Sequence, residues 1–363
     1  MTGVIIAGGE GIRLRPLTHT RPKPMMPIAN KPLLQYQIEL LKKHGVTNIV
    51  LCVRNGVDKI ELHFGDGSAF GLRIVYSVET KPLGTGGAVR FSEPHWQHDF
   101  AIIMNGDGLI DYSLSDIVDF HLNRQADVTI GLMEVPKPTH CGIVDVGQDS
   151  RITAFNEPDR TAKKAFISST ENAADTATVN AGIYVISRNA LQSIPFGAEC
   201  SIEKEFFPSV IRAGKAIYGF PLHGYWKDIG SPVNYLQATH DLLSGKVDAE
   251  IIGQRSDGGY RVSEDVSIAP SAKVSANSCL GSGCVVGEDA VVAGCTSISS
   301  GCKIGNGSVL DGCVLLENVE VGNNCRLRNC IIDSNCRIED RTLIGEGSVI
   351  GADSIIKSPS LDA

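Results

Sequence analysis

An apolar residue recurs at every sixth position through about 80 residues near the C-terminus. The phase holds over nine positions, shifts by a five-residue step, holds over two, shifts again and holds over four. These positions are Ile268, Val274, Leu280, Val286, Val292, Ile298, Ile304, Leu310, Leu316, Val321, Leu327, Ile332, Ile338, Ile344 and Ile350. A hexapeptide period is typical of a parallel β-helix in which three repeats form one triangular coil. We therefore predict a left-handed parallel β-helix of about five coils.

The residue two places before each apolar position is small or β-branched, which suits a tightly packed interior. Eight of the eleven cysteines lie after residue 275, and no CxxC pair occurs. Five of them occupy the small-residue position: Cys284, Cys302, Cys325, Cys330 and Cys336. A thiol there acts as a compact apolar side chain. We favour packing for these cysteines over a metal site or disulfides.

The chain before the repeat alternates apolar runs with amphipathic stretches. The runs cover 4–7, 49–53, 73–78, 100–104 and 128–133, and "LLQYQIELLKKHG" is a typical intervening helix that ends at Gly45. Such alternation predicts a Rossmann-like α/β domain, with a mainly parallel sheet covered on both faces. Ligands of such sheets bind beyond the carboxyl ends of the strands. We predict a catalytic domain over 1–245, a connector over 246–262 and the β-helix domain over 263–357.

The overall composition excludes several classes of protein. A length of 363 residues suits two domains. The net charge is −8 and no basic run suggests a nucleic-acid groove. No apolar stretch reaches the roughly 18 residues of a membrane helix. Met1 leads directly into a strand-like run, so no signal peptide is visible, and we expect a cytoplasmic protein without membrane or nucleic-acid partners.

The first apolar run is followed by "AGGEGIRLRPLTHTRPKPMMPIANKP", residues 7–32. Glycines after a strand let backbone N–H groups point at an anion. The stretch has no G-x-x-x-x-G-K-[ST] motif, and Leu14 occupies the place of the third glycine in G-x-G-x-x-G. What remains is a phosphate loop over 8–11, followed by Arg13 and by Lys23 in a proline-stiffened segment. Two fixed cations beside a glycine loop suit a triphosphate.

Motifs along the whole chain resemble those of the sugar-1-phosphate nucleotidyltransferases. After the stretch above come "ETKPLGTGGAV" at 79–89, "NGD" at 105–107, "CGIV" at 141–144, "VNAGIY" at 179–184 and "SIEKEFFP…GYWKDIGSP" at 201–232. The length and the hexapeptide tail are most similar to the mannose-1-phosphate guanylyltransferases. The resemblance implies transfer of a nucleoside monophosphate, GMP from GTP, to a sugar 1-phosphate, mannose 1-phosphate, with release of pyrophosphate.

The resemblance also assigns the site residues. The catalytic ones are Arg13, Lys23, Asp107 and Asp228, and the two aspartates hold Mg²⁺, which prefers a few carboxylates together with substrate phosphate oxygens. The nucleotide-binding residues are Ala7, Gly8, Gly9, Gly11, Arg13, Glu79, Pro82 and Gly84. The sugar-phosphate-binding residues are Gly142, Glu157 and Asn180. A carboxylate at Glu79 suits the N1–H and N2–H₂ edge of guanine, which favours GTP over TTP or UTP.

Two positions depart from the family pattern. The family's "GTR" reads Gly11-Ile12-Arg13 here, and its F-x-E-K-P appears as the shorter "FNEP" at 155–158, without the lysine that meets the sugar phosphate. Lys163 and Lys164 are the candidates to replace that lysine. Three alternatives stay open: glucose 1-phosphate with TTP or UTP, a cyclitol phosphate acceptor, and a non-catalytic regulatory homologue.

A hexapeptide acyltransferase is a further class to consider. Such enzymes generally use a histidine as general base, whereas all nine histidines of this chain lie at or before His240. The β-helix is therefore predicted to be structural, serving contacts in a homo-oligomer or regulation.

Overall fold

The computed structural model describes residues 1–136, 142–156 and 176–358. The chain forms two compact units. The first contains residues 1–9, 38–106 and 112–224, and the second contains residues 10–37, 107–111 and the chain from Tyr225 onward. Most of the proline-rich segment and the residues around Asp107 thus fold in the same unit as the β-helix.

A nine-stranded sheet forms the centre of the first unit. Four neighbouring strands run parallel in the order β6-β1-β4-β5. Their bounds are β1 (Thr2–Ile6), β4 (Asn48–Val53), β5 (Arg73–Val78) and β6 (Phe100–Asn105). The other five are β8 (Val128–Pro136), β9 (Ile143–Val146), β10 (Ile152–Asn156), β11 (Thr176–Ser187) and β12 (Ile217–Pro221).

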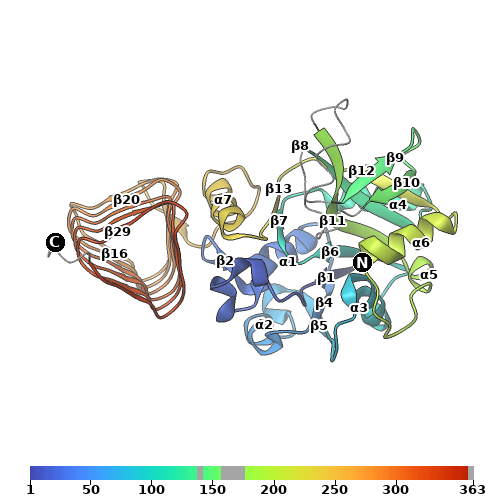
Figure 1. Ribbon diagram of the computed structural model, residues 1–363, viewed down its shortest axis with the longest axis horizontal. Coiled ribbons are helices and arrows are strands. Elements are labelled where there is room, and N and C mark those ends of the chain that lie inside the picture. The colour runs from blue at the N-terminus through green and yellow to red at the C-terminus, as the bar shows by residue number, and fades with distance from the viewer. Residues whose placement is uncertain (137–141, 157–175, 359–363) are drawn as a thin grey trace. The chain divides into compact units, whose positions relative to one another are not determined.

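Helices cover both faces of the parallel strands (Figure 1). Gly3 and Val4 are consecutive in β1, so they face opposite sides of the sheet. A Cβ added at Gly3 would lie 2.8 Å from Cδ1 of Leu41 in α1, whereas Val4 belongs to the apolar cluster that includes Val89 of α3. The helices are α1 (Leu33–Lys43), α2 (Val57–Phe64), α3 (Gly84–Ser92), α4 (Leu114–Asn123), α5 (Arg188–Leu191) and α6 (Phe207–Arg212). The predicted covered parallel sheet is confirmed.

Strand β11 introduces antiparallel pairing into the same sheet. It runs antiparallel to β6 on one side and to β8 on the other, and β9 and β10 also pair antiparallel. The apolar runs alone did not indicate this change of direction, because buried strands of either orientation have the same composition. The sheet therefore has four neighbouring parallel strands, which include the strand before the glycine loop, and a mixed part in which β12 pairs parallel with β8 and the other pairs are antiparallel.

The second unit contains short strands and one long helix beside the β-helix. The paired strands are β2 (Pro27–Ile28) with β3 (Lys31–Pro32), and β7 (Gly108–Ile110) with β13 (Trp226–Asp228); the helix is α7 (Pro232–Leu243). The proline-rich segment itself forms three 3₁₀ turns at Ile12–Leu14, Leu17–His19 and Lys23–Met25. None of the helices in the described residues is long and apolar enough to cross a membrane.

The β-helix is a stack of triangular coils (Figure 1). Its strands of two or three residues pair only in parallel, except for β14 (Gln254–Arg255), and form three sheets. In chain order they are β15 (Arg261–Val262), β16 (Ser267–Ile268), β17 (Lys273–Val274), β18 (Cys279–Leu280), β19 (Val285–Val286), β20 (Val291–Ala293), β21 (Ser297–Ile298), β22 (Lys303–Ile304), β23 (Val309–Asp311), β24 (Val314–Leu315), β25 (Glu320–Val321), β26 (Arg326–Arg328), β27 (Ile331–Ile332), β28 (Arg337–Ile338), β29 (Leu343–Ile344), β30 (Val349–Ile350) and β31 (Ile355–Ile356).

The structure corrects the predicted register at one coil. Leu315, not Leu316, pairs with Ile298 on the coil before and with Ile332 on the coil after. The first five-residue step therefore falls between Leu310 and Leu315, at a turn where Gly312 has a φ of +61°. Leu316 instead belongs to an apolar cluster with side chains of the proline-rich segment and α7. Because both residues are leucine, the periodicity alone could not place the step.

The cysteine positions follow the prediction. The five cysteines at the small-residue position are buried within the β-helix, in one cluster with the apolar side chains of its three sheets. They act as interior packing residues. Their burial reflects the narrow cross-section of the coil, which admits only short side chains at these places.

Candidate active site

The pairing of β7 with β13 brings Asp107 and Asp228 together. Asp228 is the register partner of Gly108, the residue that follows Asp107, and Ile229 N donates a 2.8 Å hydrogen bond to Asp107 O. Asn234 Nδ2 then donates to Asp228 O at 2.9 Å, which ties the second aspartate to the start of α7. Two carboxylates far apart in sequence are thus held side by side by backbone bonds.

Lys23 lies between these two carboxylates. Its ammonium Nζ is 3.0 Å from Asp107 Oδ2 and 3.5 Å from Asp228 Oδ1, and the residue is only 8% exposed. The bare α-carbon of Gly11 makes room for the lysine stem, because an added Cβ there would lie 3.0 Å from Lys23 Cβ. Thr18 Oγ1 donates to Gly11 O at 2.8 Å and holds this turn in place.

Arg13 approaches the same aspartate from a more exposed position. Its Nη2 is 3.6 Å from Asp228 Oδ2, and 62% of its side chain is exposed. Gly230 permits the approach: a Cβ there would lie 2.6 Å from Asp228 Oδ2 and 2.8 Å from Arg13 Nη2. Sequence reasoning did not single out Gly230, although the glycine two places after the aspartate in "DIGSP" was its visible signal.

The charges of this cluster are partly compensated. Burial raises the pKa of Asp228, and the nearby charge of Asp107 raises it further, while Lys23 and Arg13 act in the opposite direction. Asp228 Oδ1 is buried and accepts no hydrogen bond from the described residues. An additional cation would relieve the repulsion between the two carboxylates.

The donor set fits Mg²⁺ bound mainly through its substrate. No group of three or more acidic, histidine or cysteine side chains gathers to hold a metal among the described residues. Mg²⁺ is commonly bound by one or two carboxylates when water and phosphate oxygens supply its other ligands, and one oxygen here, Asp228 Oδ1, accepts no hydrogen bond from the described residues. Asp107 and Asp228 would hold the ion.

The glycine turn after β1 lies in the first unit up to Gly9. Ala7 N donates to Cys52 O at 2.8 Å, which continues the strand pairing to the start of the turn. A Cβ at Gly8 would lie 3.6 Å from Arg54 and 3.7 Å from Glu79 Oε1, and one at Gly9 would have nothing within 4 Å. The backbone at Gly9 is therefore open to approach by a ligand.

Glu79 is fixed close to this turn. Its Oε2 accepts a hydrogen bond from Leu83 N at 3.1 Å. Burial raises its pKa, while the Leu83 N–H and the charge of Arg54 lower it. Pro82 is exposed. Gly84 has a φ of +68°, and an added Cβ would lie 2.6 Å from Cys200 O, so packing against Cys200 requires glycine here whether or not a base lies nearby.

The structure also brings Gly142 and Asn180 together. Asn180 N donates to Gly142 O at 3.1 Å, its Nδ2 donates to the Tyr184 hydroxyl at 2.8 Å, and its Oδ1 accepts from Gly182 N at 2.9 Å. Internal bonds thus fix the orientation of the Asn180 amide.

Glu203 is a further polar residue of this region that sequence reasoning missed. Its Oε2 accepts from Thr85 Oγ1 at 2.9 Å at the start of α3, and its Oε1 accepts from the Tyr184 hydroxyl at 3.5 Å. Glu203 therefore links the helix after the predicted base site to the strand that carries Asn180. The predicted Glu157 and the substitute lysines Lys163 and Lys164 lie outside the described residues.

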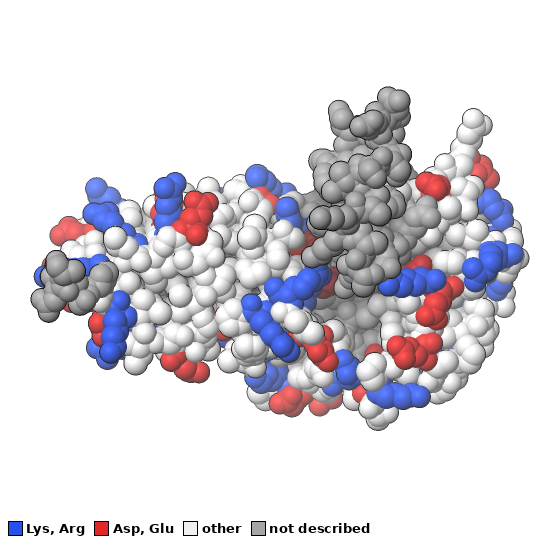
Figure 2. Space-filling model, viewed as in Figure 1, with Lys and Arg blue, Asp and Glu red and all other residues white. Residues whose placement is uncertain are grey.

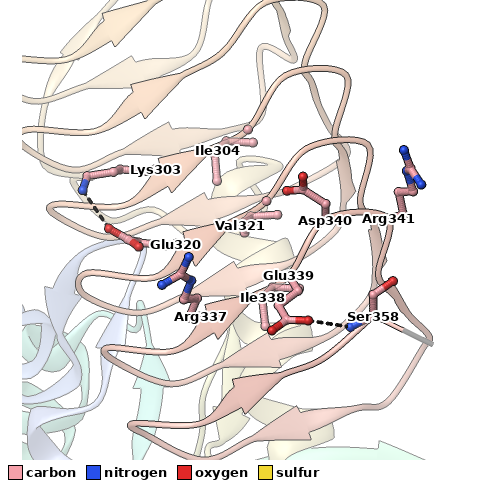
Figure 3. A pocket seen from close by; sticks show the side chains of 12 residues that line it. Lys303, Ile304, Glu320, Val321, Arg337, Ile338, Glu339, Asp340, Arg341 and Ser358 are labelled. Atoms are coloured by element: carbon pink, nitrogen blue, oxygen red, sulfur yellow. Dashed lines mark hydrogen bonds and ion pairs between the residues drawn. The ribbon is translucent and has the colours of Figure 1, made fainter. Parts of the chain in front are cut away.

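A groove of about 860 Å³ on the outer face of the β-helix offers a contrast (Figure 3). Lys303 pairs with Glu320 at 2.7 Å, and Arg337 and Arg341 lie among acidic neighbours that include Asp340. Acidic and basic side chains are likewise interspersed over the visible face in Figure 2. This groove lacks the concentrated positive charge that a triphosphate requires.

Two carboxylates around a buried lysine in one unit, and a glycine turn after a parallel strand in the other, are features of an enzyme that handles phosphate groups. The family described as "Nucleotidyl transferase" matches residues 2–245, and the chain belongs to this family. The family described as "EIF2B subunit epsilon LbH domain" matches residues 258–360, in agreement with the left-handed β-helix predicted from the hexapeptide period.

Individual relatives agree with this family. The chain is 35% identical over 286 residues to the mannose-1-phosphate guanylyltransferase of Mycobacterium tuberculosis, covering 78% of this chain and 76% of the relative. It is 33% identical to the UTP–glucose-1-phosphate uridylyltransferase of Synechocystis, covering 68% and 64% of the two chains. The crystal structure of HddC from Yersinia pseudotuberculosis complexed with GMP-PN matches with a TM-score of 0.55 at 26% identity, covering 66% of this chain and 99% of that one. The predicted family, fold class and enzyme class are confirmed.

Proposed function

We propose that this protein transfers the guanylyl group of GTP to mannose 1-phosphate, forming GDP-mannose and releasing pyrophosphate. The observation that carries the proposal is the position of the Lys23 ammonium, 3.0 Å from Asp107 and 3.5 Å from Asp228. A buried cation held by two carboxylates is suited to receive phosphate groups and, with them, a divalent metal ion.

The reaction needs no nucleophile from the protein. An oxygen of the sugar phosphate forms a bond to the α-phosphorus of GTP, and the bond from that phosphorus to the oxygen bridging to the β-phosphate breaks. The bridging oxygen leaves with the electron pair as part of pyrophosphate. Lys23 and Arg13 stabilise the negative charge that spreads over the phosphates, and the backbone of Gly8, Gly9 and Gly11 lets them approach closely. Mg²⁺ at Asp107 and Asp228, when bound, supplies further charge neutralisation.

Recognition of the two substrates is assigned to the remaining predicted residues. Glu79 accepts hydrogen bonds from guanine through the oxygen that does not bond Leu83 N, while Pro82 and Gly84 flank the base. Gly142, Glu157 and Asn180 bind the sugar. The 2.9 and 2.8 Å bonds that orient the Asn180 amide support its role, because a fixed amide discriminates between sugar hydroxyls better than a mobile one.

A uridylyltransferase acting on glucose 1-phosphate is the second candidate, favoured by the similarity to the Synechocystis enzyme. A panel that crosses GTP, UTP, TTP and ATP with mannose, glucose and cyclitol 1-phosphates, read as pyrophosphate release, decides between them. We expect the highest kcat/KM with GTP and mannose 1-phosphate. Nucleotide binding without turnover for every acceptor would instead identify a regulatory homologue.

We further propose the predicted domain boundaries, with catalysis within 1–245, a connector over 246–262 and the β-helix over 263–357. The ten cysteines within the described residues are all unpaired, which supports a reducing cytoplasmic location. A homo-oligomer that forms through the β-helix is supported by Leu343 and Ile355 near the last coil, which are 68% and 64% exposed. Light-scattering mass of the full chain tests the oligomer.

A further inference from the structure

The segment that carries Lys23 is clamped to the β-helix two residues earlier. Arg21 Nη1 and Nη2 donate to the two carboxylate oxygens of Glu317 at 3.0 and 2.9 Å, in a bidentate pair. Nη2 also donates to Ser334 Oγ at 2.6 Å and lies 3.4 Å from Asp333 Oδ1. Bidentate arginine–carboxylate pairs are strong and directional. The Arg21 side chain is 15% exposed and Asp333 is fully buried, whereas Glu317 is 41% exposed, so water competes mainly at the Glu317 carboxylate.

The two acidic residues interrupt a small-residue pattern of the β-helix. Both follow strands of one sheet, Glu317 after β24 and Asp333 after β27, on adjacent coils. The corresponding pairs on the other coils of this sheet are Ser263-Glu264, Gly281-Ser282, Ser299-Ser300 and Gly351-Ala352, so three of the four are neutral and small. The repeat itself therefore does not require a carboxylate at either place. Two neighbouring acids on a packed face repel each other unless a cation lies with them, and Arg21 supplies it.

The same segment also contacts the coils on either side of this pair. Asn30, at the tip of the β2–β3 hairpin with a φ of 68°, donates from Nδ2 to Ile298 O at 3.0 Å and accepts from Ser299 Oγ at 2.9 Å. At the other end, an added Cβ on Gly351 would lie 3.2 Å from Pro16 Cβ. The segment from Pro16 to Asn30 thus contacts four successive coils along one face of the β-helix.

We propose that Arg21, held by Glu317 and Asp333, is a positioning residue that fixes Lys23 against Asp107 and Asp228. The inference rests on the proposed function, because it assigns Lys23 a role in nucleotidyl transfer. Only Pro22 separates the two side chains, and its ring limits backbone rotation between them. The β-helix thereby contributes to the reaction although none of its residues is assigned to a substrate.

The test uses the full chain and the variants Arg21→Met, Arg21→Lys and Glu317→Gln. Glu320→Gln is the matched control, because it removes a carboxylate of the same β-helix from an exposed pair with Lys303 at 2.7 Å. Hydrogen–deuterium exchange of peptides covering residues 12–28 reports anchoring without any substrate. The amides of Met25 and Met26, which bond to Pro22 O and Lys23 O, are the ones to follow. Steady-state kinetics with GTP and mannose 1-phosphate report positioning.

We expect Arg21→Met and Glu317→Gln to accelerate exchange within residues 12–28 and to lower kcat on the order of 10- to 100-fold, with a smaller change in the KM for GTP. Arg21→Lys keeps the charge but loses the bidentate hydrogen bonds, so we expect its exchange rate and kcat to lie between those of Arg21→Met and wild type. Glu320→Gln behaves as wild type in both measurements. If Arg21→Met does not fold, Glu317→Gln carries the test, because glutamine keeps the size and one acceptor oxygen.

Wild-type kcat in a folded Arg21→Met or Glu317→Gln protein overturns the positioning role. So does a loss of kcat that parallels a loss of folded protein while exchange within residues 12–28 stays unchanged. A wild-type protein inactive on every substrate pair overturns the proposed function and the positioning role with it, whereas the exchange data then still decide whether Arg21 anchors the segment.

Discussion

At the scale of single residues, the cluster of Lys23, Asp107 and Asp228 gathers two carboxylates around one ammonium group, and a bound cation would compensate the remaining negative charge. Without ligands, burial and the charge of Asp107 hold the pKa of Asp228 above its ordinary range. The site is therefore organised for bound substrate rather than for its own stability, as is common where charged groups gather in an active site.

Asp107→Asn and Asp228→Asn should each lower the rate on the order of 10³-fold, or about 4 kcal/mol of transition-state stabilisation. Each replaces a carboxylate of the proposed metal site by an amide of the same shape, so we expect folding to be preserved. Pyrophosphate release at saturating substrates and varied Mg²⁺ measures the effect. Asp119→Asn, on the exposed side of α4, is the control. Near-wild-type turnover in either site variant would remove the metal assignment.

Glu79→Gln should reduce kcat/KM for GTP more than for UTP. Guanine presents two donors, and the amide replaces one carboxylate acceptor by a donor that faces them. Loss of a charge-assisted hydrogen bond of roughly 1.5–3 kcal/mol implies about 10- to 150-fold weaker use of GTP. Comparison of the two nucleotides in the same preparation controls for general damage to the enzyme. Equal losses for GTP and UTP would show that Glu79 does not recognise guanine.

At the scale of secondary-structure elements, successive side chains of a short β-helix strand face inward and outward in alternation. Val285 and Val286 are adjacent in β19, yet the first is 43% exposed and the second 2% exposed. The two residues have identical chemistry, so any difference between them reflects position alone.

Val286→Ala should destabilise the β-helix by about 2 kcal/mol, because it removes buried methyl groups and leaves a cavity. Val285→Ala, as the matched variant, should change stability by less than about 0.5 kcal/mol. Urea unfolding of both variants, followed by exchange protection of the coil amides, makes the comparison. Equal midpoints for the two variants would contradict the observed orientation of β19.

At the scale of the whole molecule, the Arg21–Glu317 pair makes the free energy of unfolding depend on pH. Burial raises the pKa of Glu317, but its hydrogen bond and charge interaction with Arg21 outweigh burial and lower it. A lowered pKa means that Glu317 stabilises the fold above its ordinary value of about 4.3 and loses this effect as pH falls through the lower folded value. Burial raises the pKa of Asp333, so ionisation of that carboxyl lowers the stability of the fold as pH rises.

The melting temperature of Glu317→Gln should therefore lie below that of wild type at pH 6 to 7, and the difference should shrink as pH falls below about 4.3. Since the Glu317 side chain is 41% exposed, added salt should reduce the difference at neutral pH as well. Thermal scans of both proteins between pH 3 and 7 provide the measurement. A difference that stays constant over this range would show that the carboxylate charge is not what stabilises the pair.

Removal of residues 263–363 should destabilise what remains. The apolar cluster around Leu14, Leu17 and Tyr235 includes Val314 and Ile331 of the β-helix, and truncation would expose it. A structural β-helix, as predicted from the sequence, implies a larger effect on stability than on the chemical step, and the loss of the partners of Arg21 adds an expected fall in kcat. Melting temperature, binding of a dye specific for apolar surface, and kcat at saturating substrate measure these effects. A truncated chain with the melting temperature and kcat of wild type would contradict both the expected loss of stability and the expected fall in kcat.

The sequence by itself determined what depends on local order. A six-residue period predicts a β-helix because each coil presents the same interior face at the same spacing. The strand–helix alternation before it predicts the parallel sheet, and the glycine turn after the first strand marks a place where the backbone is open. Motifs in their expected order identified the family, since each motif is contiguous in the chain.

Only the tertiary structure decided which distant residues meet. Lys23 and Asp107 are 84 positions apart, and Asp228 joins them because β13 pairs with β7 in the observed register. The pair of Arg21 and Glu317 spans 296 positions. It depends on the coil at which the five-residue step occurs, and the sequence could not locate that step because Leu315 and Leu316 are both leucine. A one-residue shift of register reverses which side chains face inward, so such contacts follow from strand and coil pairing rather than from any local pattern.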